Sequence, residues 1–135
     1  MSPNGDMKPS ASELIILKHL WKHQPQSLRE IHQAIVPKLS WSRSSTRTTV
    51  DRMVGKSMLR VEDSHGLKIY SAKLKKIPTI AALVRQFTED VLGIDAPLPV
   101  SSLVDSSLLD ASELADLEAH LEKLSQIKSK DKNND

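Results

Sequence analysis

The sequence predicts a mainly α-helical fold with a small β component, an α+β arrangement in which a compact domain precedes a helical region. Three observations support this prediction. Helix-start signals, each with a capping residue and a glutamate three positions later, occur at Ser10, Ser27 and Asp110. Two short alternating segments around a glycine-containing turn have the pattern of a β-hairpin. Charge is unevenly divided: residues 1–76 contain 14 Lys and Arg against 6 Asp and Glu, and residues 77–135 contain 5 against 11.

The composition predicts a globular protein with an aliphatic core. Only four of the 135 residues are Trp, Tyr or Phe, and none is Cys, which excludes disulfides, thiolate metal sites and cysteine nucleophiles. No apolar run is long enough to span a membrane, and the first residues lack a secretory signal. We therefore expect a cytoplasmic protein with no membrane partner.

The first helix is expected to begin after Ser10 and to end before Pro25. Apolar residues recur at helical spacing, and those expected to face the core are Leu14, Leu17 and Trp21, with Ile15 and Leu20 beside them. His19 and His23 stand four residues apart, as two metal ligands on one helix face would. Because no third ligand or catalytic glutamate accompanies them, we expect no metal and no cofactor.

A second helix is expected from Ser27, closed by Pro37 and followed by a short turn at residues 38–40. Its inward side chains are expected to be Leu28, Ile31, Ala34 and Ile35. A third helix should begin near Ser42 or Arg43. Its inward face is expected to consist of Thr46, Val50, Met53 and Val54, with Met58 at the end.

The opposite face of this third helix has no large apolar side chain and is rich in hydroxyl and guanidinium groups: Arg43, Ser44, Ser45, Arg47, Thr48, Asp51 and Arg52. Arginine matches guanine edges and phosphate oxygens, and small hydroxyls allow close approach to DNA. The face is therefore expected to bind DNA, the alternative being an ordinary solvated helix face.

The alternating segments at residues 59–63 and 67–71 should form a hairpin around residues 64–66. Leu59 and Val61 are expected to point inward on the first strand, with Leu67 and Ile69 as their partners on the second. Three helices followed by a hairpin constitute a winged helix-turn-helix, in which the third helix enters the major groove and the wing rests against the backbone. No nucleophile, metal set or paired acid is visible, so we expect no enzyme activity.

The last two helices are expected to form a dimer. One opens at Ile77-Pro78, carries an apolar stripe and ends at Gly93. Residues 94–109 are expected to be irregular, apart from a possible short helix near 101–106. The last helix follows Asp110 and carries leucines spaced 3, 4 and 3 residues apart, which is a heptad seam. The dimerisation residues are Val84, Phe87, Val91, Leu103, Leu114, Leu117, Leu121 and Leu124; the alternative is that these helices fold back on their own domain.

The predicted organisation has four parts: a disordered arm at residues 1–9, a winged-helix DNA-binding domain at 10–76, a helical dimerisation region at 77–124 and a disordered tail at 125–135.

In order and spacing, several stretches resemble the penicillinase-repressor family of bacterial regulators, the BlaI/MecI/CopY type. They are Ser12-Glu-Leu with Leu20-Trp21, Trp41-Ser42 with Thr46-Arg47-Thr48 and Arg52-Met53, the wing from Leu59 to Tyr70, and Leu109-Asp-Ala-Ser-Glu-Leu-Ala-Asp-Leu117. The resemblance implies a homodimeric repressor that binds an inverted-repeat operator in double-stranded DNA. Its implied DNA contacts are Arg43, Ser44, Ser45, Arg47, Thr48 and Arg52, with His65 or Lys68 from the wing.

Three departures from the family pattern are visible. Copper-responsive members carry Cys-X-Cys motifs, which this chain lacks. Members cleaved by a sensor protease have an Asn-Phe or similar bond where this chain has Ser102-Leu103. The family glycine after the third helix is Ser57 here, so the end of that helix is expected to be less standard. A different class of function, a winged helix that binds a protein partner instead of DNA, remains the alternative.

Overall fold

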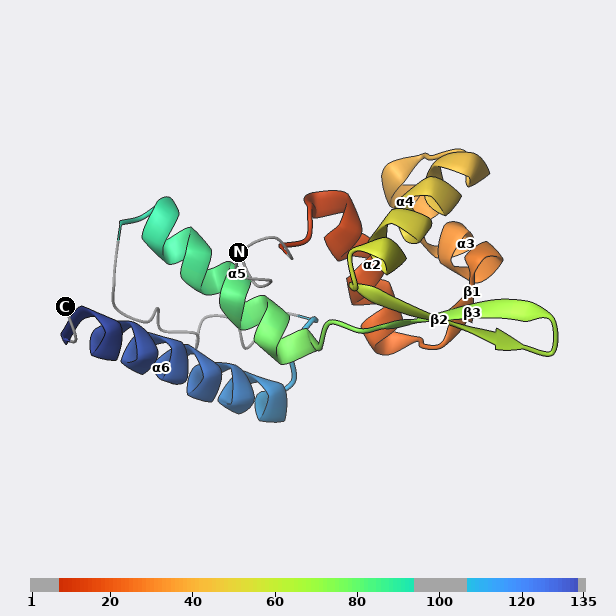
Figure 1. The fold of residues 1–135 in the computed structure, drawn as a ribbon. Helices are drawn as coiled ribbons and strands as arrows, with labels where there is room; N and C mark the ends of the chain where they lie inside the picture. The colour runs from red at the N-terminus through yellow and green to blue at the C-terminus, as the bar shows by residue number, and fades with distance from the viewer. Residues whose placement is uncertain (1–7, 94–106, 134–135) are drawn as a thin grey trace. The chain divides into compact units, whose positions relative to one another are not determined.

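The computed structural model describes residues 8–93 and 107–133, in two compact units, Met1–Lys75 and Lys76–Asp135 (Figure 1). The first unit contains α2 (Ala11–Lys22), β1 (Gln26–Ser27), α3 (Leu28–Leu39), α4 (Arg43–Gly55), β2 (Leu59–Ser64) and β3 (Leu67–Ala72). The second contains α5 (Lys76–Asp90) and α6 (Ala111–Asn133). The predicted mainly helical α+β fold with a winged helix is confirmed. None of the helices in the described part of the chain is long and apolar enough to span a membrane.

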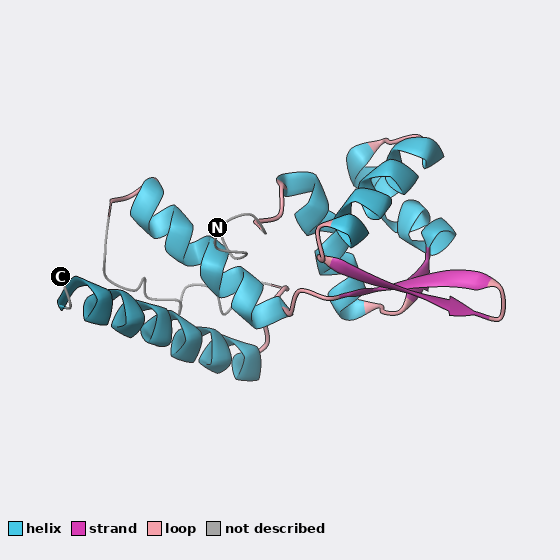
Figure 2. Ribbon diagram, in the orientation of Figure 1, coloured by secondary structure: helices cyan, strands magenta, loops and turns pink. Residues whose placement is uncertain are grey.

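The β component is a three-stranded antiparallel sheet in the order β1-β3-β2, drawn in magenta in Figure 2. The strand β1 was not expected, because two residues are too few to show an alternating pattern. It pairs Gln26 with Tyr70 and Ser27 with Ile69, and it directly precedes α3. The wing is thereby joined by hydrogen bonds to the start of the second helix of the helix-turn-helix.

The hairpin register differs from the prediction by one residue in the turn. Ser64 pairs with Leu67, so the turn consists only of His65 and Gly66, and Val61 faces Tyr70 across the ladder. Because side chains alternate along a strand, this register exchanges the two faces of β3. Tyr70 is therefore buried, whereas Leu67, which was expected to point inward, is 57% exposed, and Ile69 is only half-buried. Val61 is also exposed, at 37%.

The predicted helix starts are confirmed by their hydrogen bonds. Ser10 accepts from the Glu13 backbone N–H and its own N–H donates to the Glu13 carboxylate, and Ser27 and Glu30 repeat this capping box. The prediction that Pro37 closes the second helix is wrong, because α3 continues to Leu39 and ends at Ser40, whose φ is 53°. Proline in the last turn removes only one hydrogen bond, and its fixed φ suits a helix.

One cluster of buried side chains forms the core of the first unit. Its members are Ile16, Leu17, Leu20, Ile31, Ile35, Val50, Met53, Met58, Leu59 and Tyr70. The predicted inward face of α4 agrees with this core, since Thr46 is fully buried and Val54 half-buried. On α2 the buried face is turned toward Ile16, which was not expected there, and Leu14 is only half-buried. Ala34, expected to face inward, is exposed.

In the second unit, α5 and α6 lie side by side and run in the same direction (Figure 1). Their first turns are joined by an ion pair in which Lys76 Nζ lies 2.8 Å from Glu113 Oε2. The contact buries Ile80, Ala81 and Thr88 of α5 and the residues Leu109, Leu117 and Leu121. The helix α6 extends to Asn133, beyond Ser125, where a disordered tail was expected. Leu103 and the possible helix near 101–106 lie outside the described residues.

Candidate nucleic-acid interface

The helix α4 presents the polar face predicted from the sequence. Ser42 caps its N-terminus by accepting from the Ser45 backbone N–H at 3.2 Å. With the apolar face buried, every residue predicted to bind DNA from this helix is exposed: Arg43, Ser44, Ser45, Arg47, Thr48 and Arg52. Asp51 is exposed as well and is the only acidic residue of the helix. The exposed face thus combines three guanidinium groups with hydroxyls and one carboxylate.

Hydroxyl groups near the start of α4 form a small network. The Ser42 hydroxyl donates to Ser45 Oγ at 3.1 Å and lies 3.1 Å from Ser44 Oγ. The Thr48 hydroxyl donates back to the Ser44 carbonyl at 2.9 Å. These local hydrogen bonds link the exposed hydroxyl groups of the first turn of α4 to one another and to its backbone.

His32 of α3, which was not predicted as a functional residue, forms a hydrogen bond to the buried face of α4. His32 is half-buried, and its Nδ1 lies 2.7 Å from Oγ1 of the fully buried Thr46. The Thr46 hydroxyl donates to the Ser42 carbonyl at 3.3 Å, so it accepts from His32, whose Nδ1 carries the proton. The bond fixes the rotation of α4 against α3, and with it the direction of the exposed arginines.

The wing presents its tip residues to solvent. His65 and Gly66 have φ of 54° and 83°, the left-handed pair typical of a two-residue hairpin turn, and Gly66 N–H donates to Asp63 Oδ1 at 2.9 Å. His65 and Lys68, both predicted to bind DNA, are exposed. The hairpin projects beyond the helices of its unit (Figure 1), as a wing that contacts a DNA backbone requires.

Tyr70 connects the wing to the core cluster beneath α4. Burial, and then the negative charge of Asp51, raise the pKa of the Tyr70 phenol, while the positive charge of Arg47 acts in the opposite direction. The Tyr70 side chain belongs to the same buried cluster as Val50 and Met53 of α4. Sequence reasoning missed this role because the predicted register turned Tyr70 outward.

The other end of α4 is tied to α2. Lys56 Nζ lies 3.2 Å from Glu13 Oε2, and the Glu13 side chain is only 7% exposed. Burial acts to raise the pKa of the Glu13 carboxyl, but hydrogen bonds from Ser10 and Lys56 outweigh burial and lower the pKa below its usual value. Glu13 thus serves as a capping residue for α2 and as an anchor for the end of α4.

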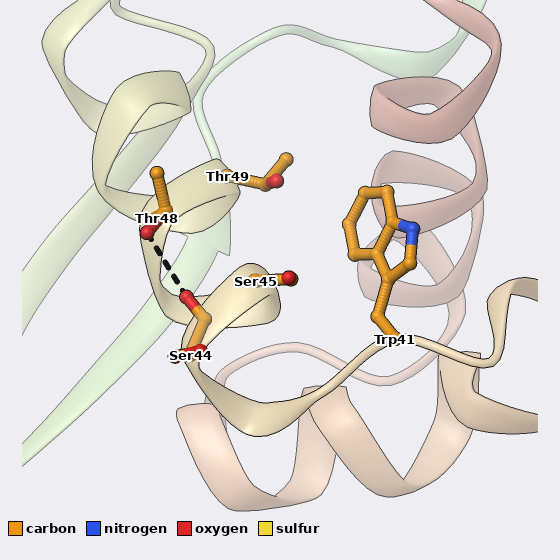
Figure 3. A pocket seen from close by; sticks show the side chains of 5 residues that line it. All are labelled: Trp41, Ser44, Ser45, Thr48 and Thr49. Carbon is orange, nitrogen blue, oxygen red and sulfur yellow. Dashed lines mark hydrogen bonds between the residues drawn. The ribbon is translucent and has the colours of Figure 1, made fainter.

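A shallow pocket of about 330 Å³ lies beside the exposed face of α4. It is lined by Trp41, Ser44, Ser45, Thr48 and Thr49 (Figure 3). The half-buried Trp41 stands opposite Ser45 and Thr49, on the segment that leads into the helix. Among the described residues no group of three or more His, Asp or Glu side chains could hold a metal ion. The His19 ring lies 5.2 Å from the His23 ring, tilted against it, and contacts the Gln26 side chain.

The residues predicted to form the dimer differ in how far they are buried within the single chain. Leu117 and Leu121 are already buried within the single chain, because α5 covers them. Val84, Leu114 and Leu124 are half-buried. Among the described residues of the second unit, the exposed large apolar side chains lie on α5 and just after it, where Phe87 is 51%, Val91 66% and Leu92 47% exposed.

Comparison with known proteins agrees with this architecture. A family model described as the penicillinase repressor matches residues 9–123, which covers most of the chain. The chain is also similar to a Latilactobacillus sakei protein described as an uncharacterized 16.5 kDa protein in the ptsI 3′ region. The two are 21% identical over 109 residues, which are 81% of this chain and 75% of the relative.

Proposed function

This chain belongs to the penicillinase repressor family of DNA-binding transcriptional regulators, and we propose that it is a cytoplasmic, homodimeric repressor that binds an inverted-repeat operator. Each copy would insert α4 into the major groove of one half-site and lay its wing along the adjacent backbone. Bound to its operator, the dimer would exclude RNA polymerase sterically, which requires no catalytic chemistry.

The observation that carries the proposal is the exposed face of α4. Its three arginines and its hydroxyls are solvent-accessible, while the same helix is held by His32 on one side and by Glu13 at its end. A helix fixed in this way can present bidentate donors to guanine edges without further ordering. The basic balance of residues 1–76 adds attraction for the phosphate backbone.

Dimerisation is proposed to use the exposed apolar surface of the second unit. Phe87, Val91 and Leu92 form an exposed apolar group at the end of α5. A second copy would bury these side chains, with the half-buried Val84, Leu114 and Leu124 at the margin. Each dimer would then present two copies of α4, matching the two-fold symmetry of an inverted repeat.

The experiment that tests the proposal is a selection of the purified full-length chain against random duplexes at moderate salt. The expected result is an inverted repeat with half-sites about one helical turn, roughly 34–36 Å, apart or a multiple of it. Recovery of an unrelated single site would contradict the dimeric mode of binding. Recovery of no sequence above background would contradict operator binding altogether.

A further inference from the structure

The pocket between Trp41 and α4 is not explained by arginine readout of guanine. Its five lining side chains are all uncharged, so no guanidinium group lines it. It opens beside the face of α4 that is proposed to enter the major groove. We infer that this pocket determines specificity by receiving the 5-methyl group of a thymine in the operator half-site, an inference that rests on the proposed function.

The walls of the pocket suit a methyl group. Figure 3 shows the Trp41 ring on one side of the pocket, with Ser45 and Thr49 on the facing side of the helix. An indole ring and a threonine methyl are apolar surfaces, and contact with such surfaces is how proteins recognise the thymine methyl in the major groove. Because Trp41 also packs against the core of the first unit, its ring is held in place before DNA arrives.

The hydrogen bonds within the pocket leave the Ser45 hydroxyl proton available. The Thr48 hydroxyl already donates to the Ser44 carbonyl at 2.9 Å. Ser45 Oγ accepts from the Ser42 hydroxyl at 3.1 Å, and among the described residues its own proton has no acceptor. In Figure 3 the Ser45 oxygen points toward the Trp41 side of the pocket. Ser45 is thus a donor that a ligand in this pocket would meet.

Thymine offers a matching edge. In the major groove its O4 acceptor stands next to the C5 methyl group, so one base can accept from Ser45 while its methyl contacts Trp41 and Thr49. Cytosine presents an amino donor in place of O4 and has no methyl, and uracil has the acceptor alone. The pocket should therefore prefer thymine to uracil through the methyl, and to cytosine through both features.

The test replaces each thymine of the selected operator by uracil, one position at a time, and measures the affinity of the full-length chain. At one symmetry-related position in each half-site, removal of the methyl should weaken binding about fourfold, the value expected for one buried methyl-sized group. The ratio of thymine to uracil affinity is the readout, because it does not depend on how stable a variant is.

The same ratio is then measured in the variants Trp41→Ala and Thr49→Ser. Trp41→Ala should bring the thymine-to-uracil ratio at that position close to 1, and Thr49→Ser should lower it part of the way, because the Trp41 ring remains. Thr49→Ser removes a single methyl and keeps the inference testable if Trp41→Ala does not fold. Lys68→Ala is the matched control: it should weaken binding to both duplexes equally and leave the ratio at about fourfold.

Two outcomes would overturn the inference while leaving operator binding intact. Either no uracil substitution weakens binding by the wild-type chain, or the loss persists unchanged in Trp41→Ala and Thr49→Ser, which would place the methyl elsewhere. Failure of the selection itself would instead refute the proposed function, and this inference with it.

Discussion

Arg47 is the side chain whose charge and position contribute most directly to the proposed readout. It is exposed on α4, and its positive charge acts to lower the pKa of the Tyr70 phenol in the wing. A bidentate arginine contact with guanine contributes about 1–3 kcal/mol of discrimination. The planar guanidinium group of Arg47 should therefore contribute more to specificity than its positive charge alone would.

We expect Arg47→Ala to abolish specific operator binding and to leave the fold intact, since the side chain is solvent-exposed. Arg47→Lys should keep weak, salt-sensitive binding but lose specificity, because an ammonium group cannot make the bidentate contact. Titration of operator and scrambled duplexes, with circular dichroism as the fold control, measures both effects. Normal operator binding by Arg47→Ala would show that α4 is not the recognition helix.

Ser57 occupies a position that favours glycine. Its φ is 64°, the Ser57 N–H donates to the Val54 carbonyl at 3.0 Å, and the Met58 N–H donates to the Met53 carbonyl at 2.9 Å. This pair of bonds is a Schellman motif, in which the left-handed residue is usually glycine. The non-standard helix end predicted at Ser57 is therefore a Schellman motif in which serine occupies the left-handed position that glycine usually holds.

Ser57→Gly should raise the free energy of unfolding by about 0.5–1 kcal/mol, because relief of the left-handed strain exceeds the added entropy of the unfolded chain. Ser57→Ala is the control, and we expect no gain from it because alanine keeps the Cβ that causes the strain. The test is urea denaturation of wild type, Ser57→Gly and Ser57→Ala, which measures the free energy of unfolding of each protein. Equal midpoints for Ser57→Gly and wild type would mean that the strain is relieved elsewhere.

At the scale of elements, contacts at both ends of α4 add to the burial of its core face in holding the helix in place. His32 holds its first turn through Thr46, and Glu13 holds its end through Lys56. Glu13 is nearly buried and its pKa is lowered, so the ionised carboxylate is the form that the folded state favours. The stability it contributes is present above its unfolded-state pKa of about 4.3 and is lost as pH falls through the lower folded-state pKa.

Glu13→Gln should therefore lower the free energy of unfolding by about 1–2 kcal/mol at neutral pH, through loss of the charged hydrogen bonds. The difference from wild type should shrink below pH 4, where the wild-type carboxyl also becomes neutral. Glu30→Gln is a matched control, since Glu30 forms the same capping box on α3 but is exposed. A pH-independent difference for Glu13→Gln would rule out the ionised pair as the cause.

At the scale of the whole molecule, the proposed mechanism requires two copies of α4 on one particle. The second unit buries Leu117 and Leu121 internally and leaves Phe87, Val91 and Leu92 open. An apolar group exposed in this way on a small helical unit is typical of an association surface. The heptad seam predicted from the leucines of α6 is thus partly an intramolecular contact, because α5 packs over it.

Phe87→Glu should shift the chain from dimer to monomer in analytical ultracentrifugation and reduce operator affinity by at least tenfold, since each half-site must then be occupied independently. Ala82→Glu is the matched control: Ala82 is exposed on the same helix, about 140° away from Phe87 by helical spacing. If Phe87→Glu stays dimeric and Ala82→Glu does not, the dimer surface lies on the opposite side of α5.

The sequence by itself determined the winged-helix architecture and the polar face of α4, because both follow from local signals. Capping serines at Ser10, Ser27 and Ser42 define helix starts, and the buried stripe of Thr46, Val50 and Met53 defines the exposed face by exclusion. Such signals act over a few residues and need no knowledge of distant segments.

Only the tertiary structure decided which face of the wing is buried, what α5 covers on α6, and what lies beside Trp41. A hairpin shortened by one turn residue exchanges the faces of β3, so Tyr70 replaces Leu67 and Ile69 as the inward residue. The strand β1, the His32 bond and the Trp41 pocket depend on segments far apart in the chain. Contacts between distant segments leave no periodic trace in the sequence, which is why packing alone determines them.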